Sequence, residues 1–199
     1  MGSSARPRIR FGEGRVFQLR VELDGVTPMV WRRIMVSGRA SLHELHRVIE
    51  RSMQRDGGGG YAFHVDGVRF VDPADEPGPG RDAHGVSLEA LALHLGIRLL
   101  HVAENHGEPW RHIVTLEQAA PRLVGQRLPS CVAGARAAPP DDCSGPRAYR
   151  ELLTALADPL GPRAAELRSW LPEHFDPEYA DVTAINAALA KVPKHRPAA

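Results

Sequence analysis

Sulfur and long apolar runs are both scarce in this sequence. Its 199 residues include only two cysteines, Cys131 and Cys143. Two thiols are too few by themselves for a zinc ribbon. In a cytosolic protein they are more often free than joined in a disulfide, and both states stay open. No apolar run approaches the roughly 18 residues that a membrane-spanning helix needs, and MGSSARPRIRFGEGR lacks the apolar core of a secretory signal. We therefore expect a soluble, cytoplasmic protein.

An excess of charge of one sign is also missing. The chain has 25 basic and 24 acidic residues, a net charge of +1, which argues against a dominant nucleic-acid surface. Residues 1–55 nevertheless carry eleven arginines against five acidic residues. Because guanidinium groups bind phosphate and carboxylate through paired hydrogen bonds, these arginines indicate either an anion-binding face or ordinary solvated side chains. A nucleic acid, a peptide, a small molecule or another anionic partner all stay open.

Alternating apolar and polar residues predict strands through the first two-thirds of the chain. Two Asp-Gly pairs, at 24–25 and 66–67, predict hairpin turns between them. The expected strands are 16–23, 29–36, the two arms of 61–71, 97–104 and 110–118.

Helical spacing of apolar residues predicts a long helix over 41–53, where Ser41 and Glu44 form a capping-box pattern. A short helix is expected at 86–93, and three more are expected at 146–159, 161–172 and within 175–192. The prediction is an α+β fold with a mixed or antiparallel sheet of about five to seven strands packed by helices.

One domain is expected to span 15–192, between a flexible arm at 1–14 and a flexible tail at 193–199. Within it, 15–128 is sheet-rich, 129–146 is an irregular cysteine loop, and 147–192 is helical.

Three stretches resemble the plasmid pRiA4b ORF-3-like family, also described as transposon-passenger proteins. They are VFQLRVELDGVTPMVWRRIMVSGRASLHELHRVIERSM, NHGEPWRHIVTLE and CVAGARAAPPDDCSGPRAYRELLTALADP, and together they cover nearly the whole chain. Matching residues in the first are Gly25, Pro28, Trp31, Arg32, Arg33, Leu45 and His46. In the second they are Gly107, Trp110 and His112. In the third they are Cys131, Gly134, Pro139, Pro140, Asp142, Cys143, Gly145 and Tyr149.

The resemblance implies an α+β fold and an association with plasmids and mobile elements, but no settled activity. This chain departs from the family where an Asp-Phe-Gly-Asp run becomes Asn105, His106, Gly107 and Glu108. A further family cysteine is replaced by Ala138, and Tyr61 stands where the family often has histidine. If relatives bind a metal with these groups, this chain has lost ligands.

Several chemistries are open at the cysteine loop. A Cys2His2 zinc site would use Cys131, Cys143, His106 and His112, since thiolate and imidazole suit zinc. Cys143 lies just before an expected helix, where the helix dipole would activate a thiol nucleophile. The favoured interpretation is a rigid wall without metal or another cofactor, with Asp142 capping the helix at Pro146 or positioning a backbone amide.

A cleft is expected where the strand of Trp110 and His112 meets the cysteine loop. Candidate acid–base or nucleophilic residues are His112, Asp142, Cys143 and Glu108. Candidate binding residues are Trp110, Arg111, Trp31, Arg33, Tyr61 and Tyr149.

The run HELHR at 43–47 is not the H-E-x-x-H of zinc proteases, because its histidines are three residues apart. We expect His46 to pack or to hydrogen-bond beneath the sheet.

Two functional classes follow from these observations. The first is a binding or accessory protein with a ligand in that cleft. The second is a small cofactor-independent enzyme of a specialised biosynthetic pathway, either an acid–base cyclase or isomerase or a cysteine-dependent catalyst.

Overall fold

A mixed β-sheet forms the body of the protein. The computed structural model describes residues 10–56, 59–75, 79–95, 98–104, 107–158, 160–172 and 175–193. The strands within these ranges are β1 (Phe11–Leu23), β2 (Trp31–Ser37), β3 (Tyr61–Val65), β4 (Val68–Val71), β5 (Arg81–Asp82), β6 (Arg98–Ala103), β7 (Trp110–Leu123) and β8 (Ser130–Ala135). They form a sheet in the order β5-β4-β3-β6-β7-β1-β2-β8. Only the pair of β4 and the two-residue β5 is parallel among these.

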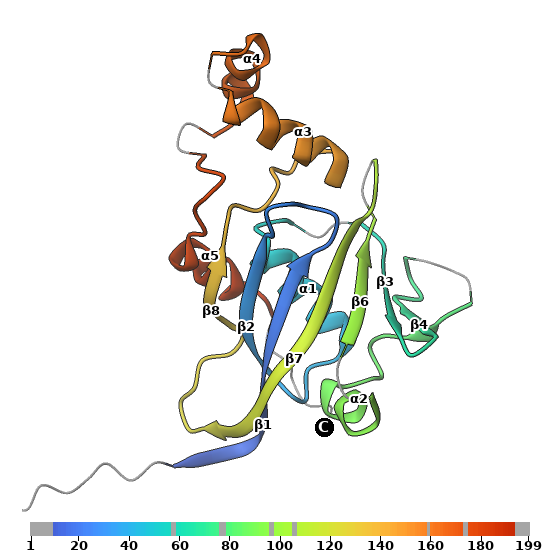
Figure 1. Ribbon diagram of the computed structural model, residues 1–199. Coiled ribbons are helices and arrows are strands. Elements are labelled where there is room, and N and C mark those ends of the chain that lie inside the picture. Colours follow the sequence, from blue (N-terminus) through green and yellow to red (C-terminus); the bar gives the residue numbers. More distant parts are fainter. Residues whose placement is uncertain are drawn as a thin grey trace, which may run out of the picture.

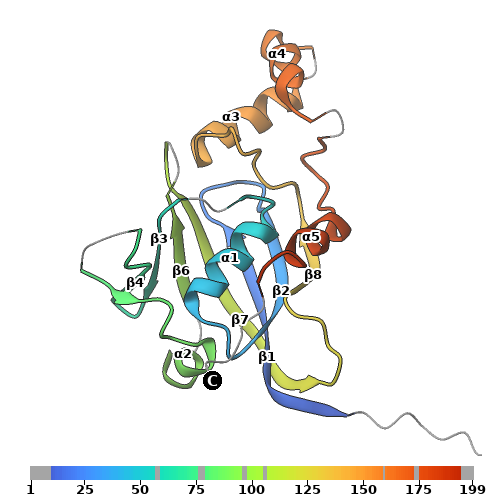
Figure 2. The same ribbon diagram turned by 180° about the vertical axis from the view of Figure 1, so that it is seen from behind.

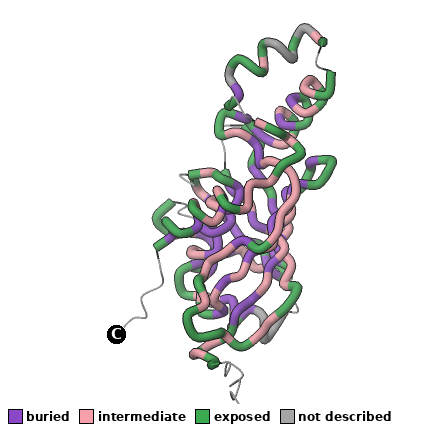
Figure 3. Tube along the Cα trace, turned by 90° about the vertical axis from the view of Figure 1, so that its left-hand side faces the viewer, coloured by how far each residue is buried: buried purple, intermediate pink, exposed green. Residues whose placement is uncertain are grey.

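Helices cover one face of the sheet and one of its ends. They are α1 (Leu42–Ser52), α2 (Leu88–Leu95), α3 (Pro146–Ala157), α4 (Pro162–Trp170) and α5 (Val182–Leu189). Figures 1 and 2 show α1 and α5 on the same face, while α3 and α4 project beyond one end of the sheet. In Figure 3 the buried stretches of chain lie in the interior of the body, and the exposed stretches lie at its surface and ends. None of the described helices combines the length and apolar character needed to cross a membrane.

Helix α1 forms where the sequence predicts it and packs its apolar stripe on the sheet. The Ser41 hydroxyl accepts a hydrogen bond from the Glu44 amide, and the Glu44 carboxylate accepts one from the Ser41 amide. This reciprocal cap satisfies amide groups that the first helical turn leaves unpaired. Leu42, Leu45 and Ile49 are fully buried against the sheet. The α+β fold is therefore confirmed.

The predicted hairpins are confirmed as well. Strands β3 and β4 turn at Asp66 and Gly67, whose φ angles are 47° and 76°. Both values lie in the left-handed region that an Asp-Gly turn supplies at low cost. Along β2, Arg32 and Ile34 are buried while Trp31 and Arg33 face the other side, as alternation requires.

Some boundaries differ from the predictions. Strand β1 begins at Phe11, which pairs with Leu123 of β7, so the strand starts within the stretch 1–14 that was expected to be a flexible arm. The expected irregular loop at 129–146 begins with a strand, β8, which pairs with β2. The sheet therefore has eight strands within the described residues, one more than the upper expectation.

The edge strand β8 is held by one asparagine of α5. The Asn186 amide oxygen accepts a hydrogen bond from the Cys131 amide at 2.8 Å, and its amide nitrogen donates to the Cys131 carbonyl at 2.9 Å. The side chain thus replaces the backbone of a further strand at this edge. Because residue 186 is 55 positions away in sequence, this pairing also fixes α5 on the sheet.

Replacing Asn186 by alanine should destabilise the fold. Asn186→Ala leaves the Cys131 amide and carbonyl without these partners, which we expect to cost about 1–3 kcal/mol. Urea unfolding followed by circular dichroism measures the loss. The matched control is Thr183→Ala, an exposed position on the same helix, which should change stability by less than about 0.5 kcal/mol. Equal stabilities of the two variants would show that the clamp contributes nothing.

Candidate functional site

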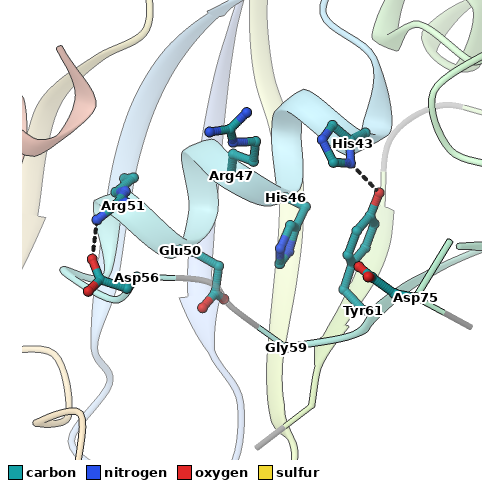
Figure 4. Close-up of a pocket in the computed structure, with 9 residues that line it drawn as sticks. All are labelled: His43, His46, Arg47, Glu50, Arg51, Asp56, Gly59, Tyr61 and Asp75. Carbon is teal, nitrogen blue, oxygen red and sulfur yellow. Dashed lines mark hydrogen bonds and ion pairs between the residues drawn. The ribbon is translucent and has the colours of Figure 1, made fainter. Parts of the chain in front are cut away.

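A polar pocket of about 270 Å³ opens beside α1. Its lining combines imidazole, guanidinium, carboxylate and phenol groups from α1, from the chain that follows α1, from β3 and from the turn after β4. The residues are His43, His46, Arg47, Glu50, Arg51, Asp56, Gly59, Tyr61 and Asp75. Figure 4 shows His46 and Glu50 pointing the same way from α1, while His43 reaches the Tyr61 hydroxyl. We call this the α1 pocket.

Three buried histidines lead from the α1 pocket into the sheet. His46 Nδ1 lies 3.0 Å from His101 Nε2, and His101 Nδ1 lies 3.1 Å from His112 Nδ1. His101 of β6 and His112 of β7 are direct cross-strand partners, so the sheet register places their rings together. His46 comes from α1 above them and stacks on Tyr61, with ring centroids 3.9 Å apart. We call His46, His101 and His112 the histidine chain.

Burial keeps the inner two members of the histidine chain neutral. Burial, together with the neighbouring His112 and His46, lowers the pKa of His101 well below its usual value. Burial, followed by the positive charge of Arg55, lowers the pKa of His112 to about 3. Each contact between neutral rings needs one proton, so the tautomers along the chain depend on one another. His46 therefore does hydrogen-bond beneath the sheet, as its sequence context predicted.

A buried ion pair lies beside the chain. Arg55 Nε is 3.3 Å from Glu50 Oε2, and the guanidinium of Arg55 stacks over the Trp110 ring at 5.3 Å from its centroid. Glu50 Oε1 is buried and has no hydrogen-bond partner among the described residues. Burial raises the pKa of Glu50, and Arg55 partly offsets this effect. Glu50 thus presents one oxygen for a further partner.

Among the described residues, two groups of side chains have the spacing of metal ligands. His46, Glu50 and His101 are all buried, and one ligand atom from each lies within 4.8 Å of the others. His43, Asp72 and His84 form a second, more exposed group, which we call the rim cluster. Its Asp72 carboxylate already receives hydrogen bonds, from the Ala74 amide at 2.9 Å and His84 Nε2 at 3.0 Å. The Ala74 contact leads the causes that lower the pKa of Asp72.

Residues 144 and 145, near the end of the cysteine loop, pack against the residues before β7. A side chain at Gly107 would collide with the Ser144 carbonyl oxygen, and one at Gly145, whose φ is +130°, would collide with Glu108. Glu108 accepts a hydrogen bond from the Arg147 amide at 3.2 Å, near the start of α3. The prediction that Asp142 caps this helix was wrong, because Gly145 is the N-cap residue and the carboxylate that accepts from the first helical turn is that of Glu108. Asp142 is exposed.

No disulfide joins Cys131 and Cys143, and both residues are buried. Cys131 Sγ contacts the Ala133 carbonyl and Cys143 Sγ the Gly145 carbonyl, and burial raises the pKa of each thiol. Raised pKa values are unfavourable for a nucleophile, which must be a thiolate. Of the expected zinc ligands, His106 lies outside the described residues. Neither thiol belongs to a group with metal-ligand spacing in the described part of the chain.

The predicted binding residues do not form one site. Trp110 and His112 are fully buried on the α1 side of the sheet, whereas Arg111 is exposed on the opposite side. Trp31 and Arg33 also lie on that opposite side, where Arg33 binds Glu117 through two hydrogen bonds of 2.5 and 2.9 Å. That contact lowers the pKa of Glu117.

Tyr149 and Tyr61 were also predicted to bind ligand, and only one of them lines a pocket. Tyr149 is buried, and its hydroxyl donates to the Ala137 carbonyl at 2.9 Å, which anchors α3. Tyr61 alone among the predicted binding residues lines the α1 pocket.

Sequence reasoning missed His43, Glu50 and His101 as site residues. The sequence does indicate that His101 is buried, because it lies two residues from both Leu99 and Ala103 and so shares their face of β6. That spacing predicts that its ring points into the core, beside the equally placed His112. Glu50 offered a weaker signal, because it lies four residues after His46 on one face of a helix.

The geometry defines a class of α+β protein with a polar pocket backed by buried histidines. The chain belongs to the family described as plasmid pRiA4b ORF-3-like protein, which matches residues 15–184. It is 33% identical over 176 residues to the uncharacterized protein y4hQ of Sinorhizobium fredii (strain NBRC 101917 / NGR234), covering 87% of this chain and 90% of the relative.

A solved structure has the same fold. The crystal structure of the protein of unknown function MM3350 from Methanosarcina mazei Go1 superimposes with a TM-score of 0.77 at 29% identity, covering 86% of this chain and 98% of the other.

Acid should destabilise this protein in a way that depends on the histidine chain. The folded pKa values of His101 and His112 are lowered, so below the usual value of 6.5 the unfolded chain binds protons that the folded chain does not. The free energy of unfolding should fall from about pH 6.5 toward pH 3 and gain nothing from these groups above about pH 7. Urea unfolding between pH 7 and 4, in a buffer with chelator, measures the slope.

The variant His112→Gln isolates this effect. Without His112, the unfolded chain binds one proton fewer, so the free energy of unfolding should change with pH less steeply, by up to about 1.4 kcal/mol per pH unit. The exposed His64→Gln serves as the matched control and should keep the wild-type slope. Identical slopes in the wild type and His112→Gln would mean that His112 titrates as it does in the unfolded chain.

The two thiols should be protected in the folded protein. Cys131 and Cys143 are buried and their pKa values are raised, so a disulfide reagent such as DTNB should react with both slowly at pH 7. Two thiols per chain should react at once in guanidinium chloride. Rapid modification of Cys143 in the native state would restore it as a candidate nucleophile, and Cys143→Ala would identify the reacting residue.

Proposed function

We propose that this protein is a binding protein whose ligand is a small polar molecule with an anionic group, held in the α1 pocket. The observation that carries the proposal is the lining of that pocket, which gathers two imidazoles, two guanidiniums and a phenol beside three carboxylates in about 270 Å³. Two of those carboxylates, Asp56 and Glu50, already pair with Arg51 and Arg55. This volume lies near the lower end for ligand pockets, and the lining is more polar than most. A small ligand with several hydrogen-bonding groups fits such a site.

Arg47 supplies the expected contact to the anionic group. It is exposed beside the pocket, and no ion pair links it to an acidic side chain of the described residues. The neighbouring Arg51 already pairs with Asp56, as Figure 4 shows. A ligand carboxylate or phosphate would therefore find one uncommitted guanidinium at this rim.

The arginine-rich N-terminal part does not favour a nucleic-acid partner. Arg32 is buried and donates to the carbonyl oxygens of Ser52, Trp31 and Ala135. Arg20, Arg33, Arg39, Arg51 and Arg55 are each paired with a carboxylate. Guanidinium groups occupied in this way leave little free positive surface for a phosphate backbone.

The α1 pocket replaces the cleft predicted between the Trp110–His112 strand and the cysteine segment. Trp110, His112, Cys131 and Cys143 are all buried, so their side chains fill the space where a ligand was expected. The α1 pocket reaches β7 only indirectly, through the histidine chain. An accessory role on mobile elements rests on the plasmid in the family's description alone.

Acid–base catalysis is the second candidate function. The observation in its favour is the histidine chain, because three linked imidazoles next to Glu50 can relay a proton from the pocket. A cyclase or isomerase of a specialised pathway would need little more. Cysteine-dependent catalysis is disfavoured by the buried thiols and their raised pKa values.

Loss of Arg47 should weaken anion binding. With inorganic phosphate and malonate as probes, amide shifts in a ¹⁵N NMR titration should move along α1 and at the start of β3. Arg47→Gln should weaken binding about ten- to hundredfold, the effect of losing one charge-assisted hydrogen bond. The matched control Arg98→Gln removes an exposed arginine of β6 outside the pocket and should leave affinity unchanged.

The same titration separates the two locations for a ligand. Arg111 was expected to line the other cleft, so Arg111→Gln is the informative comparison. Loss of binding in Arg111→Gln, with shifts in β7 and the cysteine segment, would contradict the α1 pocket. Absence of any shift at saturating probe would contradict anion binding itself.

A further inference from the structure

We propose that His46, Glu50 and His101 form a binding site for one divalent transition-metal ion of the zinc or ferrous-iron type. All three side chains are buried, and one ligand atom from each lies within 4.8 Å of the others. Two imidazoles and one carboxylate are the ligand set of many zinc and non-haem iron centres, which keep coordination positions open.

The spacing of the two nitrogens fits neighbouring positions around one ion. His46 Nδ1 and His101 Nε2 are 3.0 Å apart. With metal–nitrogen bonds of about 2.1 Å, two nitrogens at this separation subtend an angle of roughly 90°. His46 and Glu50 are four residues apart on α1, so both extend toward the same side. Both also line the α1 pocket, which leaves the remaining positions accessible.

Glu50 carries the independent observation for a missing partner. Its Oε2 is paired with Arg55 at 3.3 Å, but Oε1 is buried and unpaired among the described residues. The Glu50 side chain is only 3% exposed. An unpaired carboxylate oxygen at this depth is costly unless a cation or a donor occupies the space beside it. A metal ion held by two imidazoles meets this requirement.

His112 orients the ligand His101. A metal on His101 Nε2 needs the lone pair of that nitrogen, so the proton of His101 must lie on Nδ1. His112 Nδ1 lies 3.1 Å from His101 Nδ1 and can accept a hydrogen bond from its N–H group. Metal-binding histidines generally have such a partner on their second nitrogen, which fixes the tautomer and the ring orientation.

The rim cluster is the weaker candidate for the metal. Both carboxylate oxygens of Asp72 already accept hydrogen bonds, from the Ala74 amide and His84. The cluster is also more exposed, with side-chain exposures of 47% for His84 and 25% for His43. Its carboxylate contacts are thus explained by hydrogen bonding, and its two imidazole rings stack on each other with centroids 3.9 Å apart.

This inference deepens the proposed function, on which it rests for the molecule that would complete the coordination. The metal itself is tested without that molecule. Protein made without a histidine tag is stripped with chelator and titrated with Zn²⁺ by calorimetry, and with Co²⁺ by visible absorption. We expect one ion per chain, with a cobalt spectrum of nitrogen and oxygen ligation.

Variants assign the site. Glu50→Gln and His101→Gln should each lower Zn²⁺ affinity more than His112→Gln, which acts through His101 and should cost about ten- to hundredfold with the stoichiometry kept. The matched control Asp72→Asn removes the carboxylate of the rim cluster and should bind as the wild type does. Circular dichroism shows whether each variant folds. If a variant does not fold, the cobalt spectrum of the wild type still distinguishes nitrogen and oxygen ligands from sulfur.

Three results would overturn the proposal. They are the absence of stoichiometric binding by the wild type, loss of binding in Asp72→Asn with retention in Glu50→Gln, and a thiolate charge-transfer band, which would assign the metal to a cysteine. The phosphate titration is done on metal-free protein, so its outcome is separate. Metal binding without anion binding contradicts only the proposed function, and anion binding without metal contradicts only this inference.

Discussion

A contact between two neutral imidazole nitrogens is a hydrogen bond only if one of the two carries a proton. The histidine chain has two such contacts in series, so the proton on each ring restricts the proton on the next. A charged ring would carry a proton on both nitrogens, but burial lowers the pKa values of His101 and His112 and so keeps both rings neutral. The arrangement also depends on the fold, because it needs α1 above the sheet and β6 in register with β7. The pocket, the neighbouring ion pair and the candidate metal ligands all follow from this placement.

Two arginines, the buried Arg32 and the partly buried Arg55, connect the pocket to the rest of the molecule. Arg55 pairs with Glu50 and stacks on the face of Trp110, the first residue of β7. Just before β7, the Glu108 amide donates a hydrogen bond to the carbonyl of Ser144 in the cysteine loop. Arg32 links the end of α1 to the edge strand β8 through backbone carbonyls, and burial lowers its pKa. Buried guanidiniums with several acceptors make the local structure specific, because removing any one partner leaves a polar group unsatisfied. Of the arginines at the beginning of the chain, Arg32 and Arg55 thus have structural roles.

Local patterns predicted the elements well and their assembly less well. The capping box at Ser41 and Glu44 and the Asp66-Gly67 turn use neighbouring residues, so the sequence alone predicted α1 and the second hairpin. Strand β8 escaped prediction because its small residues alternate weakly and its edge is fixed by Asn186 of α5. The α1 pocket also escaped, since Glu50, Tyr61 and His101 meet only once the order β3-β6-β7 is known. The predicted cleft drew on residues that do not form one site, because Trp110, His112 and Cys143 are buried whereas Arg111 and Asp142 are exposed.

The protonation of the histidine chain is the central claim, and NMR measures it directly. In protein labelled with ¹⁵N at histidine, two-bond ¹⁵N–¹H correlations distinguish the two neutral tautomers from the charged ring. We predict that His101 and His112 are neutral at pH 6, each in a single tautomer, and that zinc places the His101 proton on Nδ1. A charged ring at His101 or His112 at that pH, or a proton on His101 Nε2 in zinc-saturated protein, would contradict the account.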